Sequence, residues 1–265
     1  MGYSAMKTRR EFMRAGAGAL AGGAIAAFSG RVLAKPAKPK VALIWSEGTA
    51  PKLVYPHDIN AVVAEGLREM RGWQVRTASL DDPDQGLSAA ALADVDVLVW
   101  WGHMKFDAIP DATVDRIVHR VREQGMGFVA LHSAHLAKPF RALLGGVSAL
   151  WAGGAYIEGK ANRVVVAAPK HPIARGVREF TIPLEERYQG RFDVPAPETI
   201  VFDGIYEGVD GENGKGWQGL TWTVGKGRLF YFRPGHESYP IFFMPEVRRI
   251  MRNAVLWTAH EEKRI

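Results

Sequence analysis

The chain has 265 residues, of which 47% are hydrophobic and 23% charged, with 29 Gly, 15 Pro and no Cys. This composition is typical of a globular protein of one ordinary domain, and the length permits a large buried core. Without cysteine, thiol catalysis, thiolate metal sites and disulfides are excluded.

The first 34 residues are typical of an export signal. The pair Arg9-Arg10 is followed by Phe12, by a short Gly- and Ala-rich apolar run, and by a small-x-small site that ends at Ala34. This is the twin-arginine form of a secretory signal, so we expect export to the periplasm and cleavage after Ala34. The run is too short and too rich in Gly and Ala to be a stable membrane anchor.

The net charge does not favour nucleic acid as a partner. The whole chain carries +6, from 34 basic and 28 acidic residues. Segment 1–34 holds five of the basic residues and one acidic residue, which leaves 29 against 27 and a net charge of +2. A nucleic-acid-binding protein would be expected to keep a basic surface after the signal is removed.

Strands and helices are expected to alternate in the first half of the chain. Residues 35–40 form a basic, Pro-rich linker, and a single domain is expected over residues 41–260. Apolar runs predict buried strands, and apolar stripes at helical spacing predict helices between them. The strands are expected at 41–45, 73–80, 94–101 and 126–131, and the helices at 55–70, 110–125 and 135–144. This alternation predicts an α/β fold with a mainly parallel sheet and helices on both faces.

The second half has a different pattern. Residues 150–225 are rich in Gly and Pro, with short β-like runs and few helical stripes, so we expect an antiparallel insertion or edge. Residues 220–237 predict a hairpin that turns at Gly225 to Gly227, and residues 245–259 predict a terminal amphipathic helix.

Polar side chains follow four of the expected strands at the point where each strand ends. These residues are Ser46 and Glu47, Gly102 and His103, the group His132, Ser133 and His135, and finally Gly235, His236 and Glu237. The carboxyl ends of central parallel strands meet at one crevice, so His103, His132 and His236 are expected to converge.

Three chemistries would use such a cluster. Imidazoles with a carboxylate can bind zinc or a similar divalent ion, with an open position that activates water or polarises a carbonyl. Alternatively, Ser133 is a nucleophile with His236 as base and Glu237 as orienting residue, although the flanking Leu131 and His135 do not form a tight nucleophile elbow. In the third chemistry, His and Glu act as acid and base without a metal.

A sugar-binding surface is predicted around the same strand ends. Aromatic residues are abundant there, among them Tyr188 and Tyr239. Glu185, Glu186 and Arg191 lie near Tyr188 in what reads as a Gly-rich loop region that reaches over the crevice. We therefore predict Glu47, Glu186, Tyr188 and Tyr239 as substrate contacts.

Four segments resemble the trehalose-utilisation (ThuA-like) family. They are WWGHMKFDAIPDATVDRIVHRV, FVALHSAHLAKPFRALLGG, EERYQGRFDVPAPETIVFDG and LTWTVGKGRLFYFRPGHESYP, and the similarity runs from about Lys40 to Ala259. The resemblance implies a flavodoxin-like doubly wound sheet, as in class I glutamine amidotransferases. The catalytic cysteine of those enzymes would fall near His132 or Ser133, so their activity does not carry over.

The resemblance also implies a role in the breakdown of trehalose and related disaccharides, after a partner sugar 3-dehydrogenase has made the 3-keto derivative. The histidine motifs of the family fall on His103, His132, His135 and His236-Glu237. We expect a metal-assisted hydrolase, lyase or isomerase of a 3-keto-glycoside. The alternatives are a non-catalytic sugar-binding protein and a metal-free acid/base hydrolase.

In this interpretation the metal ligands are His103, His132 and His236, and the catalytic residues are Glu237, His135 and Ser133. Zinc is the first candidate ion and manganese the second. The sequence leaves the oligomeric state open between a monomer and a homo-oligomer.

Overall fold

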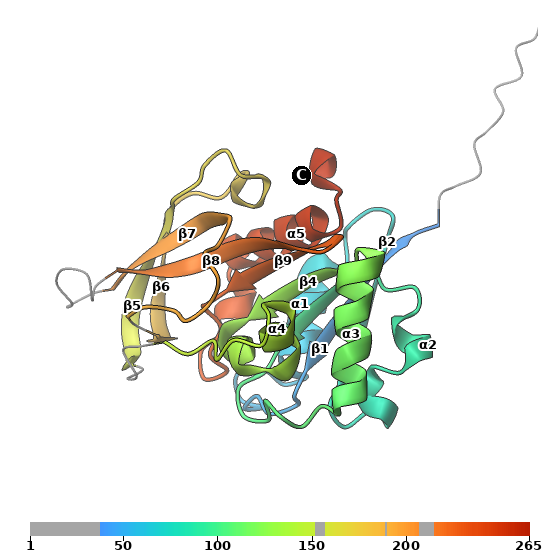
Figure 1. The fold of residues 1–265 in the computed structure, drawn as a ribbon. Coiled ribbons are helices and arrows are strands. Elements are labelled where there is room, and N and C mark those ends of the chain that lie inside the picture. Colours follow the sequence, from blue (N-terminus) through green and yellow to red (C-terminus); the bar gives the residue numbers. More distant parts are fainter. Residues whose placement is uncertain (1–37, 152–156, 189, 207–214) are drawn as a thin grey trace, which may run out of the picture. The chain divides into compact units, whose positions relative to one another are not determined.

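The apolar runs of the first half become the central strands of one sheet in the computed structural model (Figure 1). The structure describes residues 38–151, 157–188, 190–206 and 215–265. The expected signal peptide and the first residues of the linker therefore lie outside the described residues. Residues 37–265 form one compact unit. Among the residues described, no helix is both long enough and apolar enough to cross a membrane.

The described strands form a nine-stranded sheet in the order β2-β1-β3-β4-β9-β8-β7-β5-β6. The five strands from β2 to β9 are parallel to their neighbours, and the pairs from β9 to β6 are antiparallel. The parallel half has the strand order of a flavodoxin-like doubly wound sheet, so the predicted fold class is confirmed. The strands are β1 (Lys40–Ser46), β2 (Trp73–Ser79), β3 (Val97–Trp101), β4 (Gly127–Leu131), β5 (Ile157–Val166), β6 (Phe180–Arg187), β7 (Thr199–Tyr206), β8 (Lys215–Val224) and β9 (Gly227–Phe232).

Helices cover both faces of the parallel half. Two of them, α1 and α5, pack together on one face, while α3 and α4 pack together on the other. The helices are α1 (Asp58–Leu67), α2 (Ala89–Leu92), α3 (Asp111–Gln124), α4 (Lys138–Leu143) and α5 (Pro245–Thr258). Short 3-10 turns lie at Pro83–Gly86, His132–Leu136, Pro172–Ala174, Ile241–Phe243 and Glu262–Arg264. Strand β3 shows why its sequence is apolar throughout. Val99 and Trp101 face the α1 and α5 layer, whereas Leu98 and Trp100 face the α3 layer.

Helix α3 illustrates how local sequence sets the boundaries. Pro110 precedes its first residue, and Gly125 ends it in the left-handed conformation with φ 78°. Val114, Ile117 and Val121 form the buried stripe between these two residues. The expected helix is therefore present with the predicted start and stop.

The antiparallel half carries one correction to the sequence interpretation. Glu185 and Glu186 lie on strand β6 rather than in a Gly-rich loop. Pro183 and the polar residues of β6 made this segment hard to recognise as a strand, but β6 is the edge strand of the sheet, where proline is tolerated. Because side chains alternate along a strand, the adjacent Glu185 and Glu186 point to opposite faces.

Candidate functional site

Three histidines from different strand ends come together at the carboxyl edge of the parallel sheet. His103 follows β3, His132 follows β4, and His236 follows β9. Their ring centroids lie 5.4 Å (His103–His132), 4.7 Å (His103–His236) and 5.3 Å (His132–His236) apart. Together with Glu237 they offer four ligand atoms within 4.8 Å of one another, which is compatible with one metal ion. The convergence expected from the sequence is present in the structure.

Glu47 holds the loop that carries His103. Its carboxylate is buried and accepts three backbone hydrogen bonds, from the N–H groups of His103 (3.0 Å), Met104 (2.8 Å) and Lys105 (3.0 Å). Gly102 is needed beside it, because a Cβ at that position would lie 2.6 Å from Glu47 Oε1. The structure therefore places Glu47, predicted as a substrate contact, beneath the loop as a positioning residue.

His132 has an unusual backbone for a non-glycine residue. Its φ is +55°, in the left-handed region, and its side chain is fully buried. The ring Nδ1 lies 3.0 Å from the carbonyl oxygen of Arg233 and donates its proton there, which leaves Nε2 directed at the other histidines. Such local strain persists where the surrounding structure over-determines it, and it is common at functional sites.

Glu186 is the carboxylate on which all three rings converge. Its Oε2 lies 2.9 Å from His132 Nε2, 3.6 Å from His236 Nε2 and 4.0 Å from His103 Nε2. Burial alone would raise the pKa of Glu186, but its hydrogen-bond contact with His132 and the nearby histidines lower the pKa below its usual value. Glu186 is therefore ionised at neutral pH. It was predicted as a substrate contact, and the structure places it at the centre of the cluster.

Glu237 pairs with His103 on the outer side of the cluster. Glu237 Oε1 lies 2.7 Å from His103 Nδ1, whereas Glu237 Oε2 is 3.8 Å from His236 Nδ1. Burial would lower the pKa of His103, but the hydrogen bond and charge of Glu237, with Glu186 and Glu47 adding, raise it above the usual value. Burial would raise the pKa of Glu237, but its bond with His103 lowers it. The Nδ1–H of His103 is thus held by a carboxylate.

His236 is a neutral ring of the group. Burial and the neighbouring His132 lower its pKa to about 4, so the ring is neutral at pH 7. Its Nδ1 accepts the backbone N–H of Ser238 at 3.1 Å, which places the ring proton of the neutral form on Nε2, towards Glu186.

A tyrosine and a serine complete the inner wall. The Tyr188 hydroxyl contacts the Ser133 hydroxyl, lies 3.2 Å from Glu186 Oε2 and lies 3.3 Å from His132 Nε2. Burial, together with the charge of Glu186, raises the pKa of Tyr188, so its hydroxyl keeps its proton and can donate it. Ser133 is bonded to Tyr188, and Glu237 is bonded to His103, so the Ser133, His236 and Glu237 side chains do not form the hydrogen-bonded order of a nucleophile triad.

These groups face a cavity of about 320 Å³. It is lined by His103, Met104, Phe106, Ser133, Leu136, Glu186, Tyr188 and His236. Ligand pockets run from roughly 300 to 1,000 Å³, so a small ligand can be accommodated. The lining combines these polar groups with the apolar Met104, Phe106 and Leu136.

Two other predicted site residues lie beside the cavity rather than in its wall. His135 is buried behind His132, with its Nδ1 3.0 Å from the carbonyl of His132. Burial lowers the pKa of His135 to about 3, so it is a neutral packing histidine. The Tyr239 ring lies 5.8 Å from that of His236, and its carbonyl accepts the Tyr55 hydroxyl at 2.6 Å.

Arg233 was not singled out from the sequence, although it supports two site residues. Its carbonyl accepts His132 Nδ1–H, and its Nη1 donates to the carbonyl of Tyr188. The side chain is fully buried and interacts with Glu185, the buried neighbour of Glu186 on β6. A charged residue at the end of the buried run FYFRPGH was the available signal.

The comparisons with known proteins agree with this architecture. The family profile described as ThuA, trehalose utilisation, matches residues 41–258. A ThuA-like protein from Parabacteroides merdae ATCC 43184 is 17% identical, over 84% of this chain and 90% of its own, with a TM-score of 0.62. A ThuA-like protein from Bacteroides uniformis ATCC 8492 is also 17% identical, over 85% and 94%, with a TM-score of 0.59.

A more distant fold relative is PurLQS from Thermotoga maritima. It is 16% identical over 83% of this chain and 99% of its own, with a TM-score of 0.50. Sequence identities this low establish a shared fold only, and the glutamine amidotransferase-like architecture is confirmed. No curated protein sequence matches the chain.

Proposed function

This chain belongs to the trehalose-utilisation (ThuA) family, and on that premise we propose that it is a metal-assisted enzyme acting on a keto-glycoside derived from a disaccharide. The reaction is hydrolysis, elimination or isomerisation next to the ketone. The family gives the role in trehalose utilisation, and the site geometry supplies the reason for the chemistry.

One observation carries this proposal. The three histidine Nε2 atoms lie 2.9 to 4.0 Å from one carboxylate oxygen, Glu186 Oε2, at the edge of a cavity of about 320 Å³. A structural core would not collect three imidazoles and two carboxylates in this way, because each buried polar group must be satisfied.

The donor set suits a divalent ion. His103, His132 and His236 would hold it, with Glu186 or Glu237 as the carboxylate. The Nδ1–H groups of His103 and His132 are held by Glu237 and by the Arg233 carbonyl, as is usual for metal-binding histidines. Glu237 Oε2 is buried without a hydrogen-bond partner among the described residues, which is also consistent with a missing positive partner. Zinc is our first candidate because imidazole and carboxylate suit it, and manganese is the second.

When bound, the ion would polarise the ketone oxygen and stabilise the negative charge that develops on it. The protein groups then move the protons. A ketone acidifies the neighbouring C–H bond, and the ionised Glu186 can accept that proton. Tyr188 keeps its proton and can donate a hydrogen bond to a substrate oxygen. A sugar 3-dehydrogenase would supply the keto substrate.

The test is elemental analysis of the purified full chain, with turnover of 3-keto-disaccharides measured on the same samples. We expect near-stoichiometric divalent metal, lost in His103→Ala and His132→Ala and kept in His119→Ala, a helix α3 control outside the cluster. A protein that stays free of metal after loading with zinc and manganese would refute the metal-assisted mechanism.

A second candidate, metal-free acid/base catalysis, is favoured by one contact. His236 Nδ1 accepts the Ser238 N–H, so an ion on His236 Nε2 requires that bond to be given up. This candidate predicts turnover that survives chelation and is lost in Glu186→Gln. Sugar binding without any turnover would instead identify a non-catalytic binding protein.

A further inference from the structure

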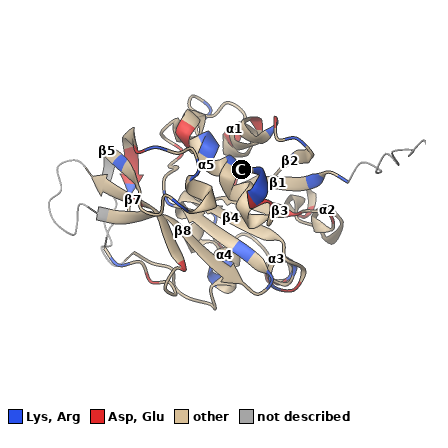
Figure 2. Ribbon diagram, turned by 90° about the horizontal axis from the view of Figure 1, so that it is seen from above, with Lys and Arg blue, Asp and Glu red and all other residues tan. Residues whose placement is uncertain are grey.

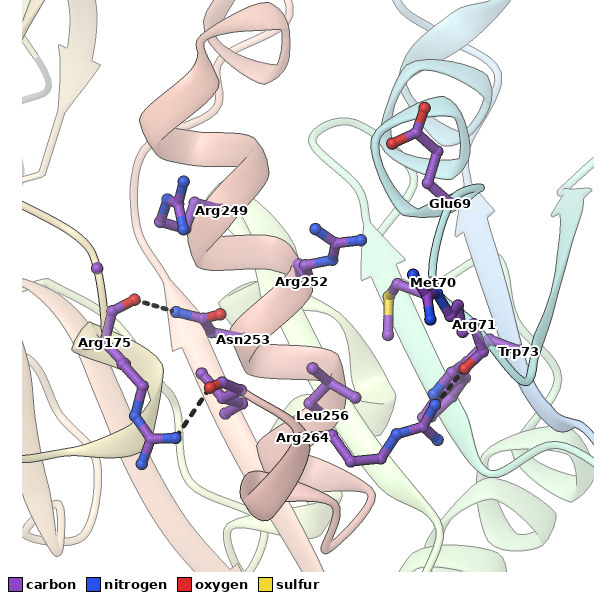
Figure 3. A pocket seen from close by; sticks show the side chains of 12 residues that line it. Glu69, Met70, Arg71, Trp73, Arg175, Arg249, Arg252, Asn253, Leu256 and Arg264 are labelled. Atoms are coloured by element: carbon purple, nitrogen blue, oxygen red, sulfur yellow. Dashed lines mark hydrogen bonds between the residues drawn. The ribbon is translucent and has the colours of Figure 1, made fainter.

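A second pocket lies at the opposite end of the parallel strands, away from the histidine cluster. It has a volume of about 440 Å³ and lies between the α1–β2 turn, helix α5 and residues 264–265 (Figure 3). Trp73, the first residue of β2, contributes to its wall, whereas the histidines follow the last residues of β3, β4 and β9. The two cavities share no lining residue.

The wall of this pocket is strongly basic. Its twelve lining residues include five arginines and one residue with an acidic side chain, Glu69, which gives a net side-chain charge of +4. The whole of residues 35–265 carries only +2. Figure 2 shows the same concentration of basic residues around α5 and the C-terminal end. Like charges repel one another, so their gathering around one concave space raises the local positive potential and attracts anions. The arginines are Arg71, Arg175, Arg249, Arg252 and Arg264.

Several arginines elsewhere in the fold pair with acids, whereas three in this pocket do not. Arg248 lies one residue from Arg249 on α5 and pairs with Glu65 at 3.4 Å, and Arg76 pairs with Asp94 at 2.7 Å. In contrast, Arg71, Arg249 and Arg252 form no ion pair with any described residue. The guanidinium groups of these three residues are therefore available to an anion in the pocket.

The other two arginines are held in place by backbone contacts. Arg175 Nη1 donates to the carbonyl of Ile265 at 2.9 Å, and Arg264 donates to the carbonyl of Arg71. Arg264 also pairs with Glu261 at 3.3 Å. Figure 3 shows both backbone contacts as dashed lines, with Arg252 projecting from α5 towards the α1–β2 turn. Guanidinium groups that are fixed before binding lose less entropy when they grip a ligand.

The floor of the pocket is apolar with one unused donor. Met70 and Leu256 are buried, and Trp73 is partly buried. The indole Nε1–H of Trp73 is shielded from solvent and has no hydrogen-bond partner among the described residues. The pocket therefore combines an apolar floor with a basic wall.

We propose that this pocket binds a small polyanion that carries two or more phosphate or carboxylate groups. Guanidinium forks recognise both groups through paired N–H···O bonds. The concave shape and apolar floor favour a small molecule over a flat anionic membrane surface. Binding there is separate from the chemistry at the histidine cluster.

The test is isothermal titration calorimetry of the full chain in low salt with two probes, tripolyphosphate and citrate. We expect saturable one-to-one binding of at least one probe, and the preferred probe identifies phosphate or carboxylate as the recognised group. The double variant Arg249→Gln, Arg252→Gln should weaken binding at least tenfold. Both positions are exposed, and Gln keeps helix propensity, so the variant should fold.

The matched control removes two exposed cations outside the pocket, Lys160→Gln and Lys226→Gln, and should change affinity less than twofold. Equal losses in the two double variants would mean attraction by overall charge and would overturn the proposal. So would the absence of saturable binding to both probes. Binding only to vesicles that contain phosphatidylglycerol, with neither small probe bound, would replace the small polyanion by a membrane surface.

Discussion

Replacing Glu47 by Gln tests whether its carboxylate holds the loop that carries His103 in place. It accepts three backbone N–H groups at 2.8 to 3.0 Å. Gln keeps one acceptor oxygen and turns an amide NH₂ towards the remaining N–H, so one hydrogen bond to a charged acceptor is lost and a buried donor is left unsatisfied. Each effect costs about 1–3 kcal/mol, and we expect a destabilisation of about 2–4 kcal/mol in total.

Urea unfolding at pH 7 measures this loss. Glu123→Gln on α3 is the control, because Glu123 is exposed, and its effect should stay within about 0.5 kcal/mol. Metal content should fall with Glu47→Gln even under conditions where the protein is folded, since the loop that carries His103 loses its anchor. A Glu47→Gln protein as stable as the control, with metal content unchanged, would refute the positioning role and return Glu47 to the substrate contacts.

Three further predictions concern the same region. Burial raises the pKa of Glu185 to about 7 from 4.5, so the unfolded chain loses this proton first and the free energy of unfolding should fall by up to about 3 kcal/mol as the pH rises from about 4.5 to 7. Glu185→Gln should remove that component in urea titrations at pH 5 and pH 8, and identical pH profiles would contradict it. Gly235→Ala should destabilise by about 2 kcal/mol or more in the same assay, because φ is +135° and a Cβ would lie 2.6 Å from Phe242 Cζ. Tyr188→Phe should lower kcat for a keto-glycoside about 100-fold and leave metal content unchanged, whereas unaltered turnover would remove Tyr188 from catalysis.

The pattern of apolar residues along the sequence was sufficient to predict the parallel half of the fold. The apolar runs of β1, β3 and β4 are buried on both faces, and α3 begins and ends at Pro110 and Gly125, so local sequence and tertiary environment agree. Strand β6 was harder because it is an edge strand with Pro183 in its middle and charged residues at its end. Its environment comes from pairing with β5, which no local pattern reveals.

The candidate site was predictable only in the positions of its histidines. The rule that strand ends meet at one edge was enough to bring His103, His132 and His236 together. It could not assign roles, since those depend on which atom faces which partner. Glu47 resembled a substrate contact until its three backbone bonds were visible, and His135 lies behind His132 with its Nδ1 at the His132 carbonyl. The support from Arg233 passes through backbone carbonyls, which the side-chain sequence does not encode.

The insertion of the antiparallel strands between two paired strands has a consequence for folding. Phe128 of β4 pairs with Leu229 of β9, although the intervening chain forms four other strands. Closing so long a segment is slow, because its entropy is lost before the contact is gained. Glu186 and Tyr188 lie within that segment and His236 lies just beyond it, so none can meet His132 until the segment has closed. On a ribosome the first half of the sheet would be available early, whereas the histidine cluster would be complete only after β9 and residues 233–237 have been synthesised.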